Sequence, residues 1–153
     1  MKLSTKGRYA VVALIDLARA PGEDGQSSLA EIARRQDISL SYLEQLFVRL
    51  RRAGLVSSVR GPGGGYRLSR PPEEIRMVDI LDAVDETVSA LHVGQGATGA
   101  VSGSLAQSMA NRLWESLSAH VYVFLANATL ADVAFNRLTP CPAVPHLLAV
   151  VDE

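Results

Sequence analysis

The stretch that decides the fold is ISLSYLEQLFVRLRRAGLVSSVRGPGGGYRL, residues 38–68. In its first half, leucine and phenylalanine recur at spacings of three and four, which predicts a helix that ends at Gly54 and buries one face. The expected core residues of that helix are Leu43, Leu46, Phe47 and Leu50. The same periodicity turns the polar residues and one valine outward, namely Ser41, Glu44, Gln45, Val48, Arg49 and Arg52.

The second half of this stretch predicts a β-hairpin. Residues 55–60 and 66–69 are short extended segments, and the alternation along the first of them indicates a hairpin with one buried face. Upstream, residues 4–20 predict a helix, and the sequence LAEIARRQ after the N-cap candidate Ser28 predicts a second, shorter one. Helix, helix, tight connection, helix and hairpin follow one another in the order of a winged helix.

The glycine-rich segment between the two strands, residues 61–65, is not a nucleotide-binding loop. A mononucleotide loop needs a lysine and a helix after its last glycine, but here Gly65 is followed by Tyr66 and a strand. The spacing of a dinucleotide fingerprint is absent as well. A tight hairpin needs only one or two glycines, so the excess indicates that the backbone approaches another body closely. Arg60 and Arg67 on either side indicate that this body is anionic.

The rest of the chain completes a mainly α fold with a small β-hairpin wing. Residues 1–70 form the expected winged helix-turn-helix DNA-binding domain, and residues 71–88 form a connecting segment whose part MVDILDAVDETV, 77–88, predicts an amphipathic helix. Residues 89–104 are nearly all small and predict a flexible loop. Residues 105–153 hold a long helix, expected over 105–126 with an apolar stripe, and a proline-punctuated tail.

Composition places the chain among ordinary globular proteins. Of its 153 residues 48% are hydrophobic and 20% are charged. Asp16 interrupts the apolar run near the N-terminus, which argues against a signal peptide, and no apolar run reaches the roughly 18 residues of a membrane span. Cys141 is the single cysteine, so no internal disulfide is expected. We therefore expect a soluble, cytoplasmic protein without a membrane partner.

Charge is distributed unevenly along the chain. The formal net charge is only −1, but residues 1–70 carry twelve Lys or Arg against six Asp or Glu, whereas residues 71–153 carry three against ten. A polyanion would be attracted to the first half and repelled by the second. A solvated surface of uneven charge is the alternative explanation.

Together, the outward face of the third helix and the arginine-flanked wing indicate DNA binding. A recognition helix presents polar side chains to base edges in the major groove, while a wing reaches the flanking backbone or minor groove. Gln45 suits adenine, Glu44 suits cytosine, and Arg49 and Arg52 suit phosphates or guanine. For each residue taken alone, a solvent-facing position is the competing interpretation. The candidate DNA-binding residues are Ser39, Ser41, Tyr42, Glu44, Gln45, Arg49, Arg52, Arg60, Gly61 and Pro62.

At these residues the chain resembles the IscR-type winged-helix transcription regulators, which control iron–sulfur cluster assembly genes in bacteria. The stretches that carry the resemblance are LSTKGRYAV at 3–11, the opening stretch at 38–68, VDETV at 84–88 and LWESLSAHVYVFLANATLADV at 113–133. The resemblance implies a homodimer formed through the long helix and a palindromic operator in double-stranded DNA. It places the groove-reading positions at Ser41, Tyr42, Glu44 and Gln45 and the wing arginine at Arg60, and it links the glutamate to the choice between operator classes.

The resemblance also implies a 2Fe–2S cluster held by three cysteines and a histidine in the loop before the long helix. Here that loop, residues 90–111, contains no cysteine, and two of the ligand positions read Ser108 and Asn111. The remaining candidate cluster ligand and metal ligand is Cys141, because thiolate is the ligand that iron–sulfur clusters prefer. His146 lies five residues beyond it, and His92 stands at the start of the loop. The alternatives are an incidental tail cysteine, oxidation of Cys141, or sensing of a small molecule without metal.

These observations favour a sequence-specific transcriptional regulator, most simply a repressor of iron–sulfur assembly or iron metabolism genes that senses iron or cluster status. A regulator of the same family that responds to redox state or to a small molecule is the alternative. A thiol enzyme built on Cys141 would need His120 or His146 as a base, but no nucleophile turn or oxyanion motif accompanies the cysteine, so no enzyme is expected. A winged helix that binds protein rather than DNA would lack a strong salt dependence of DNA affinity.

Overall fold

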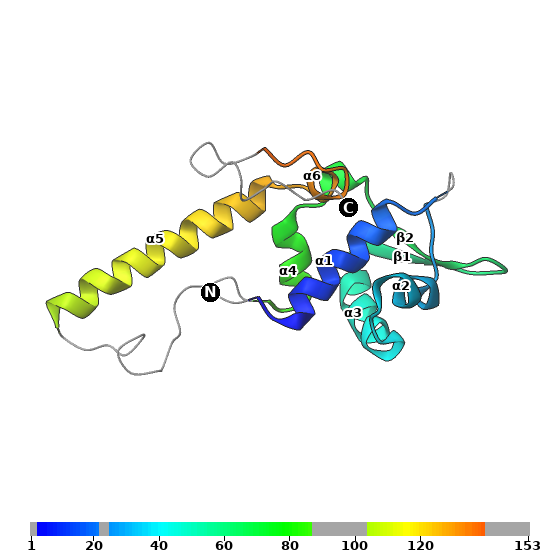
Figure 1. Cartoon of the computed structure of the whole chain (residues 1–153), viewed down its shortest axis with the longest axis horizontal. Helices are drawn as coiled ribbons and strands as arrows, with labels where there is room; N and C mark the ends of the chain where they lie inside the picture. The colour runs from blue at the N-terminus through cyan, green and yellow to red at the C-terminus, as the bar shows by residue number, and fades with distance from the viewer. Residues whose placement is uncertain (1–2, 22–24, 87–103, 140–153) are drawn as a thin grey trace.

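The computed structural model describes residues 3–21, 25–86 and 104–139 (Figure 1). Helix α1 (Thr5–Ala18) is followed by α2 (Leu29–Gln36) and α3 (Leu40–Arg52), and then by strands β1 (Val56–Val59) and β2 (Gly65–Leu68). A short 3-10 helix, η1 (Pro72–Glu74), leads into α4 (Met77–Ala83). The long α5 (Leu105–Asn127) and the short α6 (Leu130–Ala134) complete the described chain. The expected winged-helix order is confirmed.

Side-chain caps fix where the first three helices begin. Ser4, Ser28 and Ser39 are the N-caps of α1, α2 and α3, and the hydroxyl of each accepts a hydrogen bond from a backbone amide in the first turn. Ser28 and Glu31 form a reciprocal capping box. Asp37 then takes a left-handed conformation, with φ of 52°, and turns the chain sharply from α2 into α3.

One core joins the three helices to segments from the end of the chain. Leu14 of α1, Ile32 of α2 and Phe47 of α3 are fully buried, as are Ile75 and Leu130. The segment before α4 pairs with the segment before α6: Leu130 N donates to Ile75 O at 2.7 Å and Met77 N donates to Ala128 O at 2.9 Å. The described core residues, from Ala10 near the N-terminus to Leu130 of α6, therefore share one apolar interior.

The hairpin pairs β1 with β2 in antiparallel register, Val56 opposite Leu68 and Val59 opposite Gly65. Ser58 is exposed, whereas Ser57 and Val59 are half-buried, as the alternation predicts. Val56 departs from the pattern because it is buried at the root of the hairpin, next to Leu55. The predicted alternation between the two faces of the hairpin therefore holds from Ser57 onward but not at Val56.

Helix α4 is shorter than the sequence pattern predicts. The pattern continues to residue 88, but the helix ends at Ala83. Asp85 adopts a positive φ of 53°, and Glu86 N donates to Leu81 O at 2.9 Å, which closes the helix in a left-handed turn. Residues 87–103, which include most of the predicted flexible loop, lie outside the described residues, as do residues 140–153 with Cys141.

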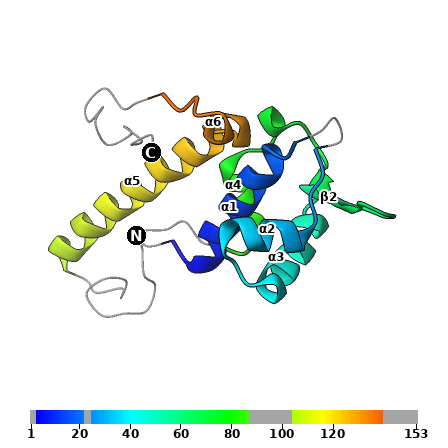
Figure 2. The ribbon, with the colours of Figure 1, turned by 45° about the vertical axis from the view of Figure 1, so that its right-hand side comes forward.

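Helix α5 contacts α4, but most of its length projects away from the body formed by α1 to α4 (Figures 1 and 2). None of its 23 residues is buried, although its expected apolar stripe is present. Leu105 is 76% exposed, Met109 63%, and Leu113 60%. Among the described residues, no helix combines the length and the apolar character needed to cross a membrane.

Candidate nucleic-acid interface

The exposed face of α3 is the first component of the candidate interface. Burial of Leu43, Phe47 and Leu50 fixes the rotation of the helix against α1 and α2. All six residues that were expected to face outward are exposed: Ser41, Glu44, Gln45, Val48, Arg49 and Arg52. The helix therefore presents hydroxyl, carboxylate, amide and guanidinium groups along one side.

The N-terminal end of α3 carries two hydroxyls close together. Ser39 Oγ accepts a hydrogen bond from Tyr42 N at 3.4 Å and lies 2.9 Å from Ser41 Oγ. Both serines are exposed. Tyr42 differs from them because it is half-buried, with its ring edge-on to Tyr9 of α1 at a centroid distance of 5.7 Å. The ring of Tyr42 thus anchors the first turn of α3 to α1.

The wing is the second component, and it projects beyond the helices (Figure 1). Arg60, Gly61 and Pro62 are all exposed at its tip. Gly61 and Gly63 have φ of 105° and 74°, values that favour glycine strongly. Gly64 N donates to Gly61 O at 2.9 Å and closes the turn.

The other two wing glycines are explained by contacts within the chain. A Cβ on Gly64 would collide with the carbonyl oxygens of Val59 and Gly61, and one on Gly65 would collide with the backbone of Ser27. The excess of glycine therefore does not require an external body, contrary to the interpretation of the sequence. Gly65 lies close to the backbone of Ser27 of the same chain, which forms a β-bridge with Tyr66.

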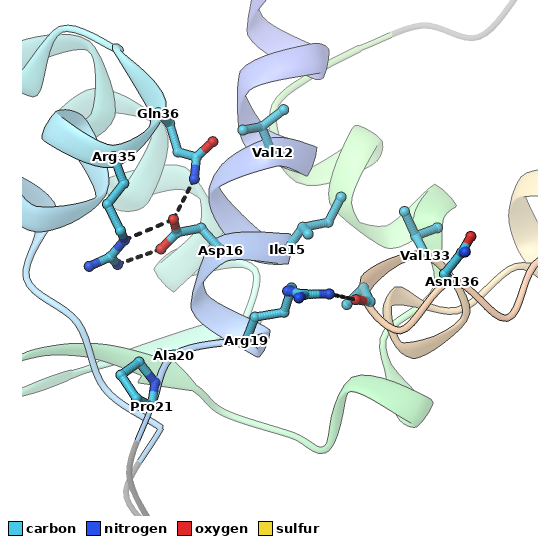
Figure 3. Close-up of a pocket in the computed structure, with 11 residues that line it drawn as sticks. Val12, Ile15, Asp16, Arg19, Ala20, Pro21, Arg35, Gln36, Val133 and Asn136 are labelled. Carbon is cyan, nitrogen blue, oxygen red and sulfur yellow. Dashed lines mark hydrogen bonds and ion pairs between the residues drawn. The ribbon is translucent and has the colours of Figure 1, made fainter. Parts of the chain in front are cut away.

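A polar network joins α1 to α2 (Figure 3), and Ser27, which pairs with Tyr66 of β2, connects this network to the root of the wing. Arg35 donates to both carboxylate oxygens of Asp16, at 2.5 and 3.0 Å, and its Nη2 also donates to Ser27 Oγ at 2.6 Å. Gln36 Nε2 donates to Asp16 at 2.5 Å. Burial raises the pKa of the Asp16 carboxyl, but the hydrogen bonds from Arg35 and Gln36 and the charge of Arg35 outweigh it, so the pKa lies below its ordinary value.

This network borders a hollow of about 720 Å³ between α1, α2 and α6. On its far side Arg19 Nη1 donates to Ala134 O, at the end of α6, at 2.8 Å (Figure 3). Val12, Ile15 and Val133 provide apolar lining. The hollow thus lies where α6, the element that follows α5, is hydrogen-bonded to the winged helix.

Arg49, one of the candidate phosphate contacts, has a partner that no sequence pattern predicted. Its Nη1 forms an ion pair with Asp85 Oδ2, just beyond α4. The two residues are 36 positions apart. Local sequence patterns do not pair residues this far apart, so the ion pair is seen only in the folded chain.

The described residues contain no cluster of three or more His, Cys, Asp or Glu side chains that could hold a metal ion. Ser108 and Asn111, at the positions where the resemblance places cluster ligands, lie on α5 and offer only a hydroxyl and an amide. These groups do not fit the thiolate and imidazole ligands of a 2Fe–2S cluster. His92, Cys141 and His146 lie outside the described residues.

Comparison with known proteins settles the class. A family model named Rrf2, described as an iron-dependent transcriptional regulator, matches residues 3–136. The chain belongs to the Rrf2 family. The HTH-type transcriptional regulator IscR of Cereibacter sphaeroides is 66% identical over 154 residues, covering 100% of this chain and 99% of that protein.

Solved structures agree with the Rrf2 fold. The structure of CymR, the global cysteine regulator of B. subtilis, matches with a TM-score of 0.74 and 37% identity, covering 89% of this chain and 98% of CymR. T. potens IscR matches with a TM-score of 0.65 and 38% identity, covering 90% of this chain and 89% of that chain. This Rrf2 protein is therefore a winged-helix DNA-binding transcriptional regulator, and its relatives are named as regulators rather than as enzymes.

Proposed function

We propose that this Rrf2 regulator binds a palindromic operator in double-stranded DNA as a homodimer, with α3 of each protomer in a major groove and each wing at the flanking backbone or minor groove. The observation that carries the proposal is the exposed, largely polar face of α3, fixed by the buried Leu43, Phe47 and Leu50, together with the exposed Arg60 at the wing tip. This is the docking geometry of winged helix-turn-helix proteins.

Within this arrangement, Ser41, Glu44 and Gln45 read base edges. Gln45 can bond adenine through two hydrogen bonds, and Glu44 can accept a hydrogen bond from the amino group of cytosine. The carboxylate of Glu44 repels base acceptors and phosphates, so Glu44 also rejects operators that lack a suitable donor. Tyr42 contributes by holding the first turn of α3 against Tyr9.

The remaining candidate residues contact the sugar–phosphate backbone or the minor groove. Ser39 lies at the N-terminus of α3, where exposed amides and hydroxyls bond phosphate oxygens. Arg49 and Arg52 project from the last turns of α3. At the wing, Arg60 enters the minor groove, while Gly61 and Pro62 bring the backbone of the tip close to the DNA.

Dimerisation is proposed to occur through α5. Its apolar side chains, Leu105, Met109, Leu113, Leu117 and Phe124 among them, are exposed in the single chain. Such a continuous apolar stripe is a typical protein interface. The α5 helix of a second copy covers it in the proposed homodimer, which places two recognition helices on one DNA duplex.

For the input signal, we propose iron or iron–sulfur status, with the protein acting in the cytoplasm as a repressor of iron–sulfur assembly or iron metabolism genes. The family description and the IscR of Cereibacter sphaeroides support this input. Cys141 is the only thiol that this chain can offer to a cluster. The other ligands must then differ from those of the family, because Ser108 and Asn111 do not fit that role.

A second candidate is a regulator that responds to redox state or to a small molecule without a cluster. Two observations favour it: the unsuitable groups at Ser108 and Asn111, and the fold similarity to CymR, which is named for cysteine regulation. Under this candidate Cys141 is an oxidation site, or an effector binds elsewhere, for example in the hollow bordered by Arg19 and Arg35.

Anaerobic purification of the wild type and of Cys141→Ala distinguishes the two inputs. Iron, sulfide and visible absorption in the wild type that are lost in the variant support the cluster. Iron-free wild-type protein that still binds promoter DNA supports the second candidate.

DNA binding itself is tested by fluorescence anisotropy over a range of salt concentrations, and the absence of any salt-dependent binding would contradict the proposal.

A further inference from the structure

The side chain of Arg49 on the recognition helix is held by a carboxylate of its own chain. Arg49 Nη1 is ion-paired with Asp85 Oδ2. Asp85 occupies the left-handed position that terminates α4, with φ of 53°. Aspartate and asparagine tolerate this conformation better than most residues. The carboxylate is therefore presented to α3 by the turn that ends α4.

Contacts to α1 hold this turn in place. Lys6 Nζ donates to Asp85 O at 3.1 Å, and Ser4 N donates to Glu86 Oε1 at 3.1 Å. Ser4 Oγ also donates to Glu86 Oε2, and Gly7 packs so closely on Glu86 that a Cβ there would lie 3.1 Å from its Cγ. The position of Asp85 relative to α3 is thus set by the fold and not by a freely moving loop.

A hollow of about 460 Å³ lies beside the ion pair. It is lined by Arg49, Arg52 and Asp85, with Ala53 and Ala83 as small neighbours. The lining contains two arginines and one aspartate, so its formal net charge is positive. Guanidinium binds carboxylate and phosphate oxygens with the same planar geometry.

The ion pair is exposed enough to be exchanged. The Arg49 side chain is 44% exposed and that of Asp85 is 75% exposed. Ion pairs with this exposure contribute little to stability, so a phosphate can replace the carboxylate at small cost.

We propose that Arg49 and Arg52 form a DNA-phosphate site in which Asp85 competes with the phosphate for Arg49. This inference rests on the proposed DNA-binding function. Because phosphate contacts carry no sequence information, the competition lowers affinity for every sequence and leaves base contacts to decide where the protein stays bound. With Asp85 present, binding to DNA therefore depends more on the base contacts of Ser41, Glu44 and Gln45.

The test compares the wild type with Asp85→Asn, Arg49→Gln and the double variant. The probe is a fluorescein-labelled DNA duplex of mixed sequence, and the readout is anisotropy at a series of KCl concentrations. Asp85→Asn should bind about two- to fivefold more tightly, as expected on removing a weak competing pair. The slope of log affinity against log salt should steepen by up to about 0.9, because Arg49 then neutralises a phosphate in a larger fraction of the complexes.

Asp82→Asn is the matched control, because Asp82 is an exposed carboxylate on α4 and the variant removes the same charge. It should change affinity and slope much less. In the Arg49→Gln background, Asp85→Asn should give no gain. Asp85→Gly, which also accepts the left-handed conformation, should reproduce the gain if the loss of the carboxylate is the cause.

Unchanged affinity and slope in Asp85→Asn, with wild-type protein that binds the duplex, would overturn the competition while leaving DNA binding intact. Weaker binding would overturn it too, since Asp85 would then orient Arg49 toward DNA. Wild-type protein that shows no salt-dependent binding would refute the proposed function, and the competition with it.

Discussion

Ser27 and Tyr66 exchange two backbone hydrogen bonds, Ser27 N to Tyr66 O at 2.9 Å and Tyr66 N to Ser27 O at 2.8 Å. This pairing adds a third, one-residue strand to the root of the wing. Tyr66 also packs edge-on against Phe47 of α3, with ring centroids 4.9 Å apart. The wing and the recognition helix are therefore positioned by the same residue.

Gly65→Ala should destabilise the protein by about 2 kcal/mol or more, because the added methyl group would collide with the carbonyl of Ser27 and break this pairing. The measurement is the free energy of unfolding in urea. Ser58→Ala on the exposed side of β1 is the control and should change that free energy by less than about 0.5 kcal/mol. Equal stability of the two variants would show that the close approach is not required.

Asp16→Asn should destabilise the protein by about 1–3 kcal/mol at neutral pH, because it weakens the charge-assisted bonds to Arg35 and Gln36. The pKa of Asp16 is lowered in the folded state. The wild-type advantage should therefore be complete above the unfolded pKa of about 3.9 and disappear as the pH falls through the lower folded pKa. Urea unfolding of both proteins across this pH range measures the difference in their free energies of unfolding. A difference that grows as the pH falls would contradict the prediction.

Arg60→Ala should weaken binding to a native operator by about 1–3 kcal/mol if the side chain enters a groove. Arg67→Ala is the matched control, because Arg67 is also exposed but lies on β2, opposite Ser57, away from the tip. It removes the same charge and should cost less. Anisotropy titrations of both variants at one salt concentration give the comparison, and equal losses would reduce the role of Arg60 to general electrostatic attraction.

Leu117→Glu should disrupt the proposed dimer, because each interface would receive two buried carboxylates without partners. Size-exclusion chromatography with light scattering should give the mass of two chains for the wild type and of one chain for the variant. Ala119→Glu is the control, since Ala119 follows Glu115 by one helical turn on the polar side of α5. A variant that remains dimeric would place the interface elsewhere.

The sequence predicted the winged helix because its signals are local. Serine caps, a buried stripe in α3 and glycines at positive φ each lie within a few residues of the structure they determine. The pattern failed where distant segments meet. It did not predict the pairing of Ser27 with Tyr66 or of Arg49 with Asp85, and it extended α4 beyond Ala83 because the amphipathic pattern continues there.

The candidate interface was also predicted only in part from sequence. Periodicity correctly turned Gln45 and Arg52 outward, since burial of the opposite face leaves them no alternative. The anchoring of Tyr42 on Tyr9 depends on how α1 crosses α3, which no local pattern specifies. The identity of the sensor ligands stays a prediction for Cys141, because thiol chemistry can be read from the sequence but a ligand set cannot.

The shared interior of α1 and α6 has a consequence for synthesis of the protein. Leu14, Ile75, Ala128 and Leu130 belong to one buried core, and Ala128 and Leu130 leave the ribosome last among them. Until these residues are made, the core of the winged helix lacks the side chains that they contribute. We therefore expect the winged helix to complete its core, and the chain to bind its operator, only after the helix proposed to join two copies has also been made.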